Sequence, residues 1–322
     1  MLRPFIASTA GAAIVLLALT ACSGSSDTAT SSATATSTST STATAAASSC
    51  SGTGDVGDIS VTGKFGSTPK VTIPKNLTVS TTSTKKLISG TGATTSTNDT
   101  LKVGLTYYEA ATCTSISAYH PEYLGSSITP TLKISGAKIG DRVLTVVTAK
   151  TIFGTSATTY GFTNKTPIVM VMDVEGTALT SAKGKAVKQD TSLPTVTMKA
   201  GKPVLKQTGG KAPTKTQIET IVKGTGAKVA AGDEVVVNYQ LTKWGKAQKV
   251  LEQSYGSSAL TTTTTSVVAG FKKALVGERV GSRVIAVVPP KDGYGSDTTS
   301  KLKKDTLVFV IDILGTVASA SS

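Results

Sequence analysis

The strand segment that decides the fold of this chain occurs in it twice. Near the C-terminus it is Phe309-Val310-Ile311-Asp312-Ile313-Leu314-Gly315-Thr316. Its counterpart, 139 positions earlier, is Met170-Val171-Met172-Asp173-Val174-Glu175-Gly176-Thr177. In both segments apolar residues recur at every second position, which is the pattern of a half-buried antiparallel strand. A strand duplicated in this way predicts a duplicated domain.

Two further pairs of segments repeat in the same order along the chain. Residues 86–103 contain two short matches to residues 220–237, at an offset of 134. Residues 139–144 match residues 280–285, at an offset of 141. The near-constant offset predicts that one domain type is present twice, with a few extra residues in the middle of the second copy.

Both copies are rich in strand patterns. In the second copy, Val235, Val237, Tyr239 and Leu241 alternate with more polar neighbours, and the first copy repeats this pattern from Leu101 onward. One short helix is predicted within 267–275, where apolar residues fall on one face at helical spacing. We therefore expect an α+β fold of two domains, each a curled antiparallel β-sheet wrapped on a short α-helix.

Residues 1–21 have the features of a lipoprotein signal peptide. Arg3 precedes an apolar stretch from Ile6 to Leu19, which is shorter than the roughly 20 residues that span a bilayer. The tetrapeptide Leu19-Thr20-Ala21-Cys22 resembles the bacterial lipobox, in which the cysteine is acylated. We expect Cys22 to anchor the protein by lipid at the extracytoplasmic face of the cell membrane. The alternative is an ordinary cleaved signal with an incidental cysteine.

Residues 22–50 are predicted to be the lipidated cysteine and a disordered stalk. Residues 23–49 are almost wholly Ser, Thr, Ala and Gly, so they have nothing to bury. With Cys22 assigned to lipid, Cys50 and Cys113 remain, and two such cysteines in an oxidising compartment favour a disulfide between them. Two free thiols and an intermolecular bond are the alternatives.

Composition excludes several classes of chemistry. The chain of 322 residues is long enough for two domains, but it has one histidine, which rules out multi-histidine chemistry. His120 lies in a polar stretch before a proline and is interpreted as a surface residue. No P-loop, paired-cysteine motif or nucleophile elbow is present, so we expect no cofactor and no metal. The net charge of +14 makes anionic wall polymers a candidate partner, whereas the motifs of nucleic-acid binding are missing.

An ordered set of segments in the second copy carries a family resemblance. After the strand that holds Tyr239 come Val250–Ser254, Val267–Phe271, Val284–Pro290, Gly293-Tyr294-Gly295 and Thr306–Phe309. In order and spacing, residues 218 to 316 resemble the FKBP-type peptidyl-prolyl isomerases. This resemblance implies an enzyme that isomerises X–Pro bonds in an apolar bowl between the sheet and the helix.

The same resemblance implies the residues of the bowl. Phe271 forms its floor, where many members of the family have Trp. The Tyr294 hydroxyl and the Val268 backbone N–H correspond to groups that bond substrate carbonyls. The expected catalytic residues are Tyr294, Phe271, Val268, Tyr239 and Glu252, and the expected substrate-binding residues are Leu251, Val267, Phe309 and Leu302. The alternative is a purely structural role, in which these side chains only form the core of a small barrel.

Some positions depart from the family pattern. The family's Phe-Asp pair is Leu251-Glu252 here, and the polar segment 296–305 is shorter than the usual substrate-covering loop. In the first copy, Leu105, Phe153 and Met170 stand where the second has Tyr239, Tyr294 and Phe309. We therefore expect the first copy to bind, space or protect without catalysis.

The expected domain organisation has six parts. After the signal peptide and the stalk come a degenerate FKBP-like domain over 51–180, a linker over 181–194, an isomerase domain over 195–317, and a tail over 318–322. We expect a monomer that isomerises X–Pro bonds of exported client proteins. The rival hypotheses are a non-catalytic binding or chaperone module and a structural envelope lipoprotein.

Overall fold

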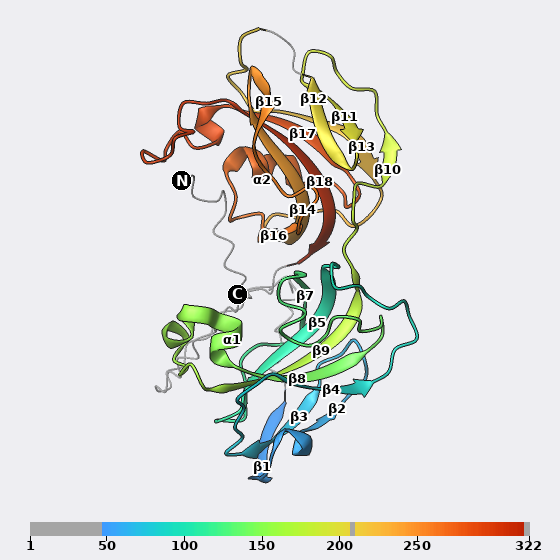
Figure 1. Cartoon of the computed structure of the whole chain (residues 1–322), viewed down its shortest axis with the longest axis vertical. Helices are drawn as coiled ribbons and strands as arrows, with labels where there is room; N and C mark the ends of the chain where they lie inside the picture. The colour runs from blue at the N-terminus through green and yellow to red at the C-terminus, as the bar shows by residue number, and fades with distance from the viewer. Residues whose placement is uncertain (1–46, 207–209, 319–322) are drawn as a thin grey trace, which may run out of the picture.

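The computed structural model describes residues 47–206 and 210–318, which form two sheet-based domains that lie one above the other in Figure 1. The predicted signal peptide and the predicted lipidation at Cys22 lie outside the described residues, as does most of the tail. No helix among the described residues is long and apolar enough to cross a membrane.

The first domain is built on one antiparallel sheet. Its strand order is β4 (Ser83–Ile88), β8 (Arg142–Thr148), β9 (Pro167–Thr177), β5 (Leu101–Glu109) and β6 (Thr114–Ser115), and β7 (His120–Leu124) also pairs with β5. Strands β5, β8 and β9 are buried along almost their whole length, because both faces of this sheet are covered.

The second domain repeats this sheet and extends it at one edge. Its strand order is β10 (Gly184–Ala186), β13 (Gln217–Gly224), β17 (Arg283–Val288), β18 (Leu307–Val317), β14 (Glu234–Lys243) and β15 (Lys246–Gln253), and β16 (Leu260–Thr263) also pairs with β14. The predicted duplication therefore holds at the level of strand order.

The duplication also holds at the level of register. Leu101 of β5 faces Thr177 of β9, and Val235 of β14 faces Thr316 of β18, which are the positions related by the sequence offsets. Both pairs of strands then shift register one residue further on, after Lys102 in one domain and after Val236 in the other. A bulge bends a strand and raises its twist, so this repeated shift helps to curl both sheets in the same way.

The two domains differ in their helices. In the second domain α2 (Ala269–Leu275) lies just before β17, and its apolar side chains Phe271, Ala274 and Leu275 are buried against the sheet. In the first domain turns occupy the matching segment, and α1 (Ala149–Phe153) follows β8 instead. Each domain thus has a short α-helix among its described residues, but the two helices lie at different places along the chain. The short 3-10 helices are η1 (Val56–Asp58), η2 (Gly154–Ser156), η3 (Thr158–Tyr160) and η4 (Pro290–Asp292).

Each domain has an N-terminal segment that covers the outer face of its sheet. In the first, β1 (Ser48–Thr53), β2 (Ser60–Thr62) and β3 (Lys70–Lys75) form a small sheet whose apolar residues pack on β8 and β9. In the second, the hairpin of β11 (Thr195–Lys199) and β12 (Lys202–Lys206) packs in the same way on β17 and β18. The sheets can therefore be apolar on both faces.

Two expected boundaries change as a result. The stalk was expected to run to residue 50, but β1 begins at Ser48 and pairs in parallel with β3. The linker 181–194 was expected to be patternless, but it contains β10 and buries Leu193 under the hairpin. A disulfide joins Cys50 of β1 to Cys113, which follows β5, with 5.4 Å between their Cα atoms.

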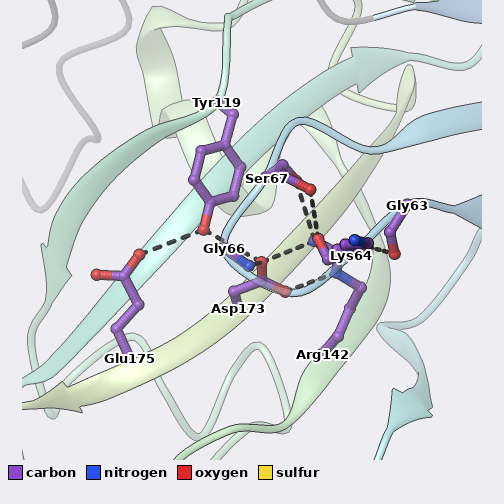
Figure 2. Close-up of polar contacts among 8 residues, drawn as sticks. All are labelled: Gly63, Lys64, Gly66, Ser67, Tyr119, Arg142, Asp173 and Glu175. Atoms are coloured by element: carbon purple, nitrogen blue, oxygen red, sulfur yellow. Dashed lines mark hydrogen bonds and ion pairs between the residues drawn. The ribbon is translucent and has the colours of Figure 1, made fainter.

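A buried ion pair fastens the covering sheet of the first domain (Figure 2). Arg142 Nε lies 2.6 Å from Asp173 Oδ1, and both side chains are almost fully buried. The guanidinium also donates to the backbone carbonyls of Gly63, Lys64 and Ser67, while the Gly66 N–H donates to Asp173 Oδ2 at 2.7 Å. The charges are thus satisfied by the turn between β2 and β3, which they hold against the main sheet.

The two domains meet where β7 approaches β14 and β18. The Tyr123 N–H donates to Glu234 Oε1 at 2.7 Å across this junction. The Tyr123 ring lies against Gly315, where an added Cβ would come within 2.5 Å of the tyrosine hydroxyl oxygen. Two more hydrogen bonds cross from the first copy to the second: Ser126 Oγ with Ser258 Oγ at 3.1 Å, and the Leu179 N–H to the Leu314 carbonyl at 2.9 Å.

His120 is not the surface loop residue that the sequence indicated. It lies in β7, where its ring is mostly buried and Nε2 is 3.1 Å from Glu122 Oε2. Its Nδ1 lies 2.9 Å from the Ala118 carbonyl, and the Tyr107 hydroxyl donates to the other Glu122 oxygen at 3.0 Å. The polar residues around His120, which suggested a loop, instead form a hydrogen-bonded group at the domain junction.

Candidate active site

Three aromatic rings form the centre of the candidate site in the second domain. Phe271 of α2 packs edge-on against Tyr239 of β14, with ring centroids 6.0 Å apart, and against Phe309 of β18, with centroids 5.2 Å apart. Phe271 and Phe309 are fully buried. The structure therefore places these three predicted residues together, with Phe271 in contact with both other rings in the edge-to-face arrangement that aromatic pairs favour.

The hairpin of β14 and β15 positions Glu252 beside this centre. The Tyr239 hydroxyl donates to Glu252 Oε1 at 2.5 Å. Burial is the main cause that raises the pKa of Tyr239, and the Glu252 carboxylate adds to it. The extra methylene of Glu, where the family has Asp, thus leaves the carboxylate within reach of the tyrosine hydroxyl.

Ser254 fixes the geometry of that hairpin, and the sequence analysis missed it. Its hydroxyl accepts a hydrogen bond from the Tyr239 N–H at 3.0 Å and donates to Asn238 Oδ1 at 3.1 Å. The Ser254 N–H donates to the Tyr239 carbonyl at 2.9 Å. Because these bonds tie the end of β15 to β14 at Tyr239, they also set where Leu251 and Glu252 lie. No sequence signal marks this serine among its polar neighbours.

The segment before α2 supplies two wall residues and a backbone donor. Val267 and Val268 are half-buried against the apolar cluster that contains Phe271. Val268 is the N-cap of α2 and is extended, with φ −60° and ψ 150°. Among the described residues, none accepts a hydrogen bond from the Val268 N–H. A substrate carbonyl could therefore accept from this donor without displacing another group.

Tyr294 is held at the same cluster by the short helix η4. Its ring is half-buried against the cluster, and burial is the main cause that raises its pKa, followed by the Glu252 and Asp297 carboxylates. Asp292 of η4 accepts hydrogen bonds from Lys273 Nζ at 2.8 Å and from the Thr216 hydroxyl at 2.5 Å. The Lys273 bond is the main cause that lowers the pKa of Asp292. Lys273 on α2 thus links the helix that carries Phe271 to the turn that carries Tyr294.

The segment after Tyr294 returns to the cluster at Leu302. Leu302 is buried among the same apolar residues, whereas Lys301, Lys303 and Lys304 around it are exposed. Leu251 and Leu260 are half-buried members of the cluster. All nine residues predicted from the family resemblance therefore lie in one cluster or bond directly to a member of it.

The matching region of the first domain is filled by its own side chains. Phe153 stacks on Phe162 with ring centroids 5.3 Å apart and contacts Tyr160 at 5.2 Å. Leu105 and Met170 are fully buried in the same core. Apolar groups stand where the second domain has the hydroxyls of Tyr239 and Tyr294, so the polar part of the site is not repeated.

The described residues contain no cluster of three His, Cys, Asp or Glu side chains that could hold a metal ion. The chemistry of the candidate site rests on apolar walls, two tyrosine hydroxyls, one carboxylate and one backbone N–H.

Comparisons with known proteins find similar sequences and structures. Residues 225–314 match the family model of the FKBP-type peptidyl-prolyl cis-trans isomerases. A Corynebacterium glutamicum protein, described as a probable FK506-binding protein, is 28% identical over 114 residues, which are 35% of this chain and 97% of that protein. The family match falls on the second domain.

Two solved structures are also similar. FkpA from Escherichia coli is 27% identical, with a TM-score of 0.31, over 36% of this chain and 55% of that one. The peptidyl-prolyl cis-trans isomerase from Pseudomonas syringae is 25% identical, with a TM-score of 0.29, over 31% of this chain and 74% of that one. The chain thus spans about half of FkpA. Residues 225–314 of the second domain therefore match the FKBP-type peptidyl-prolyl cis-trans isomerase family, which is the family that the sequence resemblance indicated.

Proposed function

We propose that the second domain isomerises X–Pro bonds of exported proteins at the cluster around Phe271. The observation that carries this proposal is that the Tyr294 ring, the Tyr239–Glu252 pair and the Val268 N–H, for which no described residue is an acceptor, lie at one apolar cluster. None of these groups needs to act as a general acid or base, because isomerisation moves no proton.

Such a site would lower the barrier by binding the twisted amide more tightly than the planar one. Rotation about a peptide bond has a barrier of about 18–20 kcal/mol because it breaks amide resonance. Only interactions that are stronger in the twisted state accelerate the reaction. Apolar walls favour the twisted amide because it has less charge separation than the planar form, and the Val268 N–H and the Tyr294 hydroxyl would hold the carbonyls on either side.

The first domain is proposed to be an accessory without turnover. Its core is closed by Phe153, Phe162 and Tyr160, and it lacks the two tyrosine hydroxyls. An exported, lipid-anchored protein remains our proposal for the location. The Cys50–Cys113 disulfide supports export, since disulfides persist in oxidising compartments.

A protease-free isomerisation assay on the full chain tests the function. Peptides with several different residues before the proline are followed by exchange NMR. Tyr294→Phe should lower kcat/KM about fivefold, because one hydrogen bond contributes about 1 kcal/mol. Tyr160→Phe in the first domain is the matched control and should leave the rate unchanged.

A second variant distinguishes a role of Phe271 in the site from a role in stability. Phe271→Leu keeps an apolar side chain but removes the ring, so we expect kcat/KM to fall below that of the wild type in protein that still unfolds cooperatively. If folded wild-type chain shows no turnover on any peptide, the function is refuted, and the rival binding or chaperone module becomes the better hypothesis.

A further inference from the structure

The positive charge of the chain is concentrated in the second domain. Residues 195–317 contain 18 Lys and Arg against nine Asp and Glu, a net of +9. Residues 51–180 contain 11 against eight, a net of +3. The main sheets of the two domains share one strand order, so that arrangement itself does not require this excess.

Part of the excess lies on the segment that returns to the candidate site. Lys301, Lys303 and Lys304 flank Leu302, whose side chain is buried among the site residues. All three lysines are exposed. Because Leu302 is anchored, the lysines next to it stay at the rim of the site.

Local hydrogen bonds hold this segment in place. Asp297 Oδ1 accepts from the Thr299 and Ser300 N–H groups at 2.9 and 3.1 Å. The Ser300 hydroxyl accepts from the Leu302 N–H at 3.1 Å, and the Asp305 N–H donates to the Leu302 carbonyl at 2.9 Å. The positions of the lysine backbones are therefore defined before any ligand arrives.

The carboxylates of this region are already engaged. Asp305 pairs with Lys243 at 2.6 Å, and Asp292 pairs with Lys273. Lys303 Nζ donates to the Thr298 carbonyl at 2.8 Å. Among the described residues, neither Lys301 nor Lys304 forms an ion pair, so their charges are not neutralised within the domain.

A second pair of uncompensated lysines lies on β15. Lys246 and Lys249 are exposed, and neither forms an ion pair with any described residue. Lys249 lies two positions before Leu251 in the same strand. Positive charge is therefore close in sequence to the wall that Leu251 forms.

We propose that the candidate site prefers X–Pro segments that carry Asp or Glu at positions flanking the bond, and that Lys301 and Lys304 are specificity-determining residues for them. This inference rests on the proposed function and names its substrate class. The preferred acidic residues lie at the rim, not beside the proline, because Glu252 already places a carboxylate at the centre of the site.

The physical basis is a long-range attraction that salt weakens. Exposed lysines raise the local concentration of an acidic segment and speed its encounter with the site. The Debye length falls from about 10 Å at 0.1 M salt to about 3 Å at 1 M, so the preference must shrink as salt rises. Preference for an acidic flank therefore differs from preference for an apolar residue, which salt does not weaken in this way.

The test uses three peptides on the full chain. They share one X–Pro centre and differ in the residues two and three positions away, which are all Glu, all Gln or all Lys. At low salt we expect kcat/KM to follow the order Glu, Gln, Lys, with about a fivefold difference between the ends. At 1 M salt the three values should converge.

Two double variants test whether the lysines beside Leu302 cause the preference for the Glu peptide. The double variant Lys301→Gln/Lys304→Gln should lose most of the preference while its rate on the Gln peptide stays unchanged. The control Lys199→Gln/Lys206→Gln removes the same charge from the β11–β12 hairpin, which packs on the opposite face of the sheet, and should keep the preference.

Three outcomes overturn the inference. Equal rates on all three peptides refute the preference, while turnover on the Gln peptide shows that the proposed function stands. Loss of preference in both double variants shows that net charge, not the rim, is responsible. A proline-free glutamate peptide of the same length could inhibit turnover of the Gln peptide as strongly as the proline-containing Glu peptide does. That result would show a general surface for anionic polymers and not a preference of the site. Absence of turnover on every peptide would instead refute the proposed function.

Discussion

Glu234 in the second domain accepts a hydrogen bond from the backbone N–H of Tyr123 in the first, at 2.7 Å. Burial, with the nearby Glu122 carboxylate, raises the pKa of Glu234 to about 7. Burial opposes the charged form of His120, but its hydrogen bond and charge contact with Glu122 outweigh this and raise its pKa above 6.5. Both His120 nitrogens also face acceptors, the Ala118 carbonyl and Glu122, which a doubly protonated ring satisfies.

These shifts predict that the folded protein is more stable at pH 5 than at pH 8. The pKa of Glu234 is raised on folding, so the folded state binds its proton more tightly and gains stability as pH falls from about 7 to 4.5. The raised pKa of His120 acts in the same direction, since its stabilisation is lost as pH rises through the folded value. After discounting for partial exposure, we expect a difference of about 2 kcal/mol in the free energy of unfolding.

Urea unfolding between pH 5 and 8 measures this dependence. Glu234→Gln should flatten the profile, because the amide does not titrate. Glu219→Gln, at another carboxylate of the second domain, is the control and should leave the profile as in the wild type. A profile for Glu234→Gln as steep as that of the wild type would show that the junction does not sense pH.

A second prediction concerns Arg142 and Asp173, which Figure 2 shows at the centre of a hydrogen-bonded group. Removing one partner of a buried ion pair leaves a buried charge without compensation and costs about 3–5 kcal/mol. Asp173→Asn should therefore destabilise the first domain strongly and release the turn at Gly63–Ser67. Hydrogen exchange of the amides in this turn reports its release directly.

The equivalent pair in the second domain provides the comparison. Arg283 Nε lies 2.6 Å from Asp312 Oδ1, but the guanidinium is more exposed than that of Arg142. Asp312→Asn should thus cost less than Asp173→Asn. A larger cost at Asp312 would contradict the argument that burial sets the penalty.

The repeated pair also shows which features the sequence could predict. The matching segments predict that the two domains share register, strand order and the position of the bulge, because strands with the same alternation of apolar residues pair in the same way, but they do not predict what that order is. The aromatic centre of the site could be predicted from the family resemblance, since Tyr239, Phe271 and Phe309 lie in matched segments.

Other features left no such signal. The covering segments β1–β3 and β11–β12 differ in sequence and topology, so comparing the chain with itself does not reveal them. Ser254 acts through the backbone of Tyr239, and any serine in a polar turn has the same local pattern. His120 was misplaced because Glu234, in the second domain, comes near it only when the two domains pack together, although its partner Glu122 is just two residues away in β7.

Lys273 is predicted to be a positioning residue for Tyr294. Its bond to Asp292 links α2 to η4, and exposed ion pairs contribute about 0.2–1 kcal/mol. We expect Lys273→Ala to lower kcat about two- to fivefold with little change in KM, because the hydroxyl is less often in place once the substrate is bound. Lys272→Ala, one residue earlier on the same helix, is the matched control.

Rescue distinguishes positioning from a loss of net charge. Lys273→Arg keeps a donor that can reach Asp292 and should restore most of the rate, whereas Lys273→Gln should not. Equal rates for Lys273→Ala and Lys272→Ala would show that the bond to Asp292 does not support catalysis.

The disulfide between Cys50 and Cys113 leads to the last prediction. It closes a loop with a sequence separation of 63. In the chain-entropy model a loop of this length stabilises the folded state by about 4 kcal/mol. Cys113 is buried beneath β1, so reduction should loosen the covering sheet first. Replacing both cysteines by serine should therefore lower the melting temperature of the first domain while isomerisation by the second domain continues.

Differential scanning calorimetry with a parallel activity assay on the same sample separates these effects. A coincident loss of both would show that the two domains unfold as one cooperative unit, which the hydrogen bonds at the Tyr123–Glu234 junction would then have to explain.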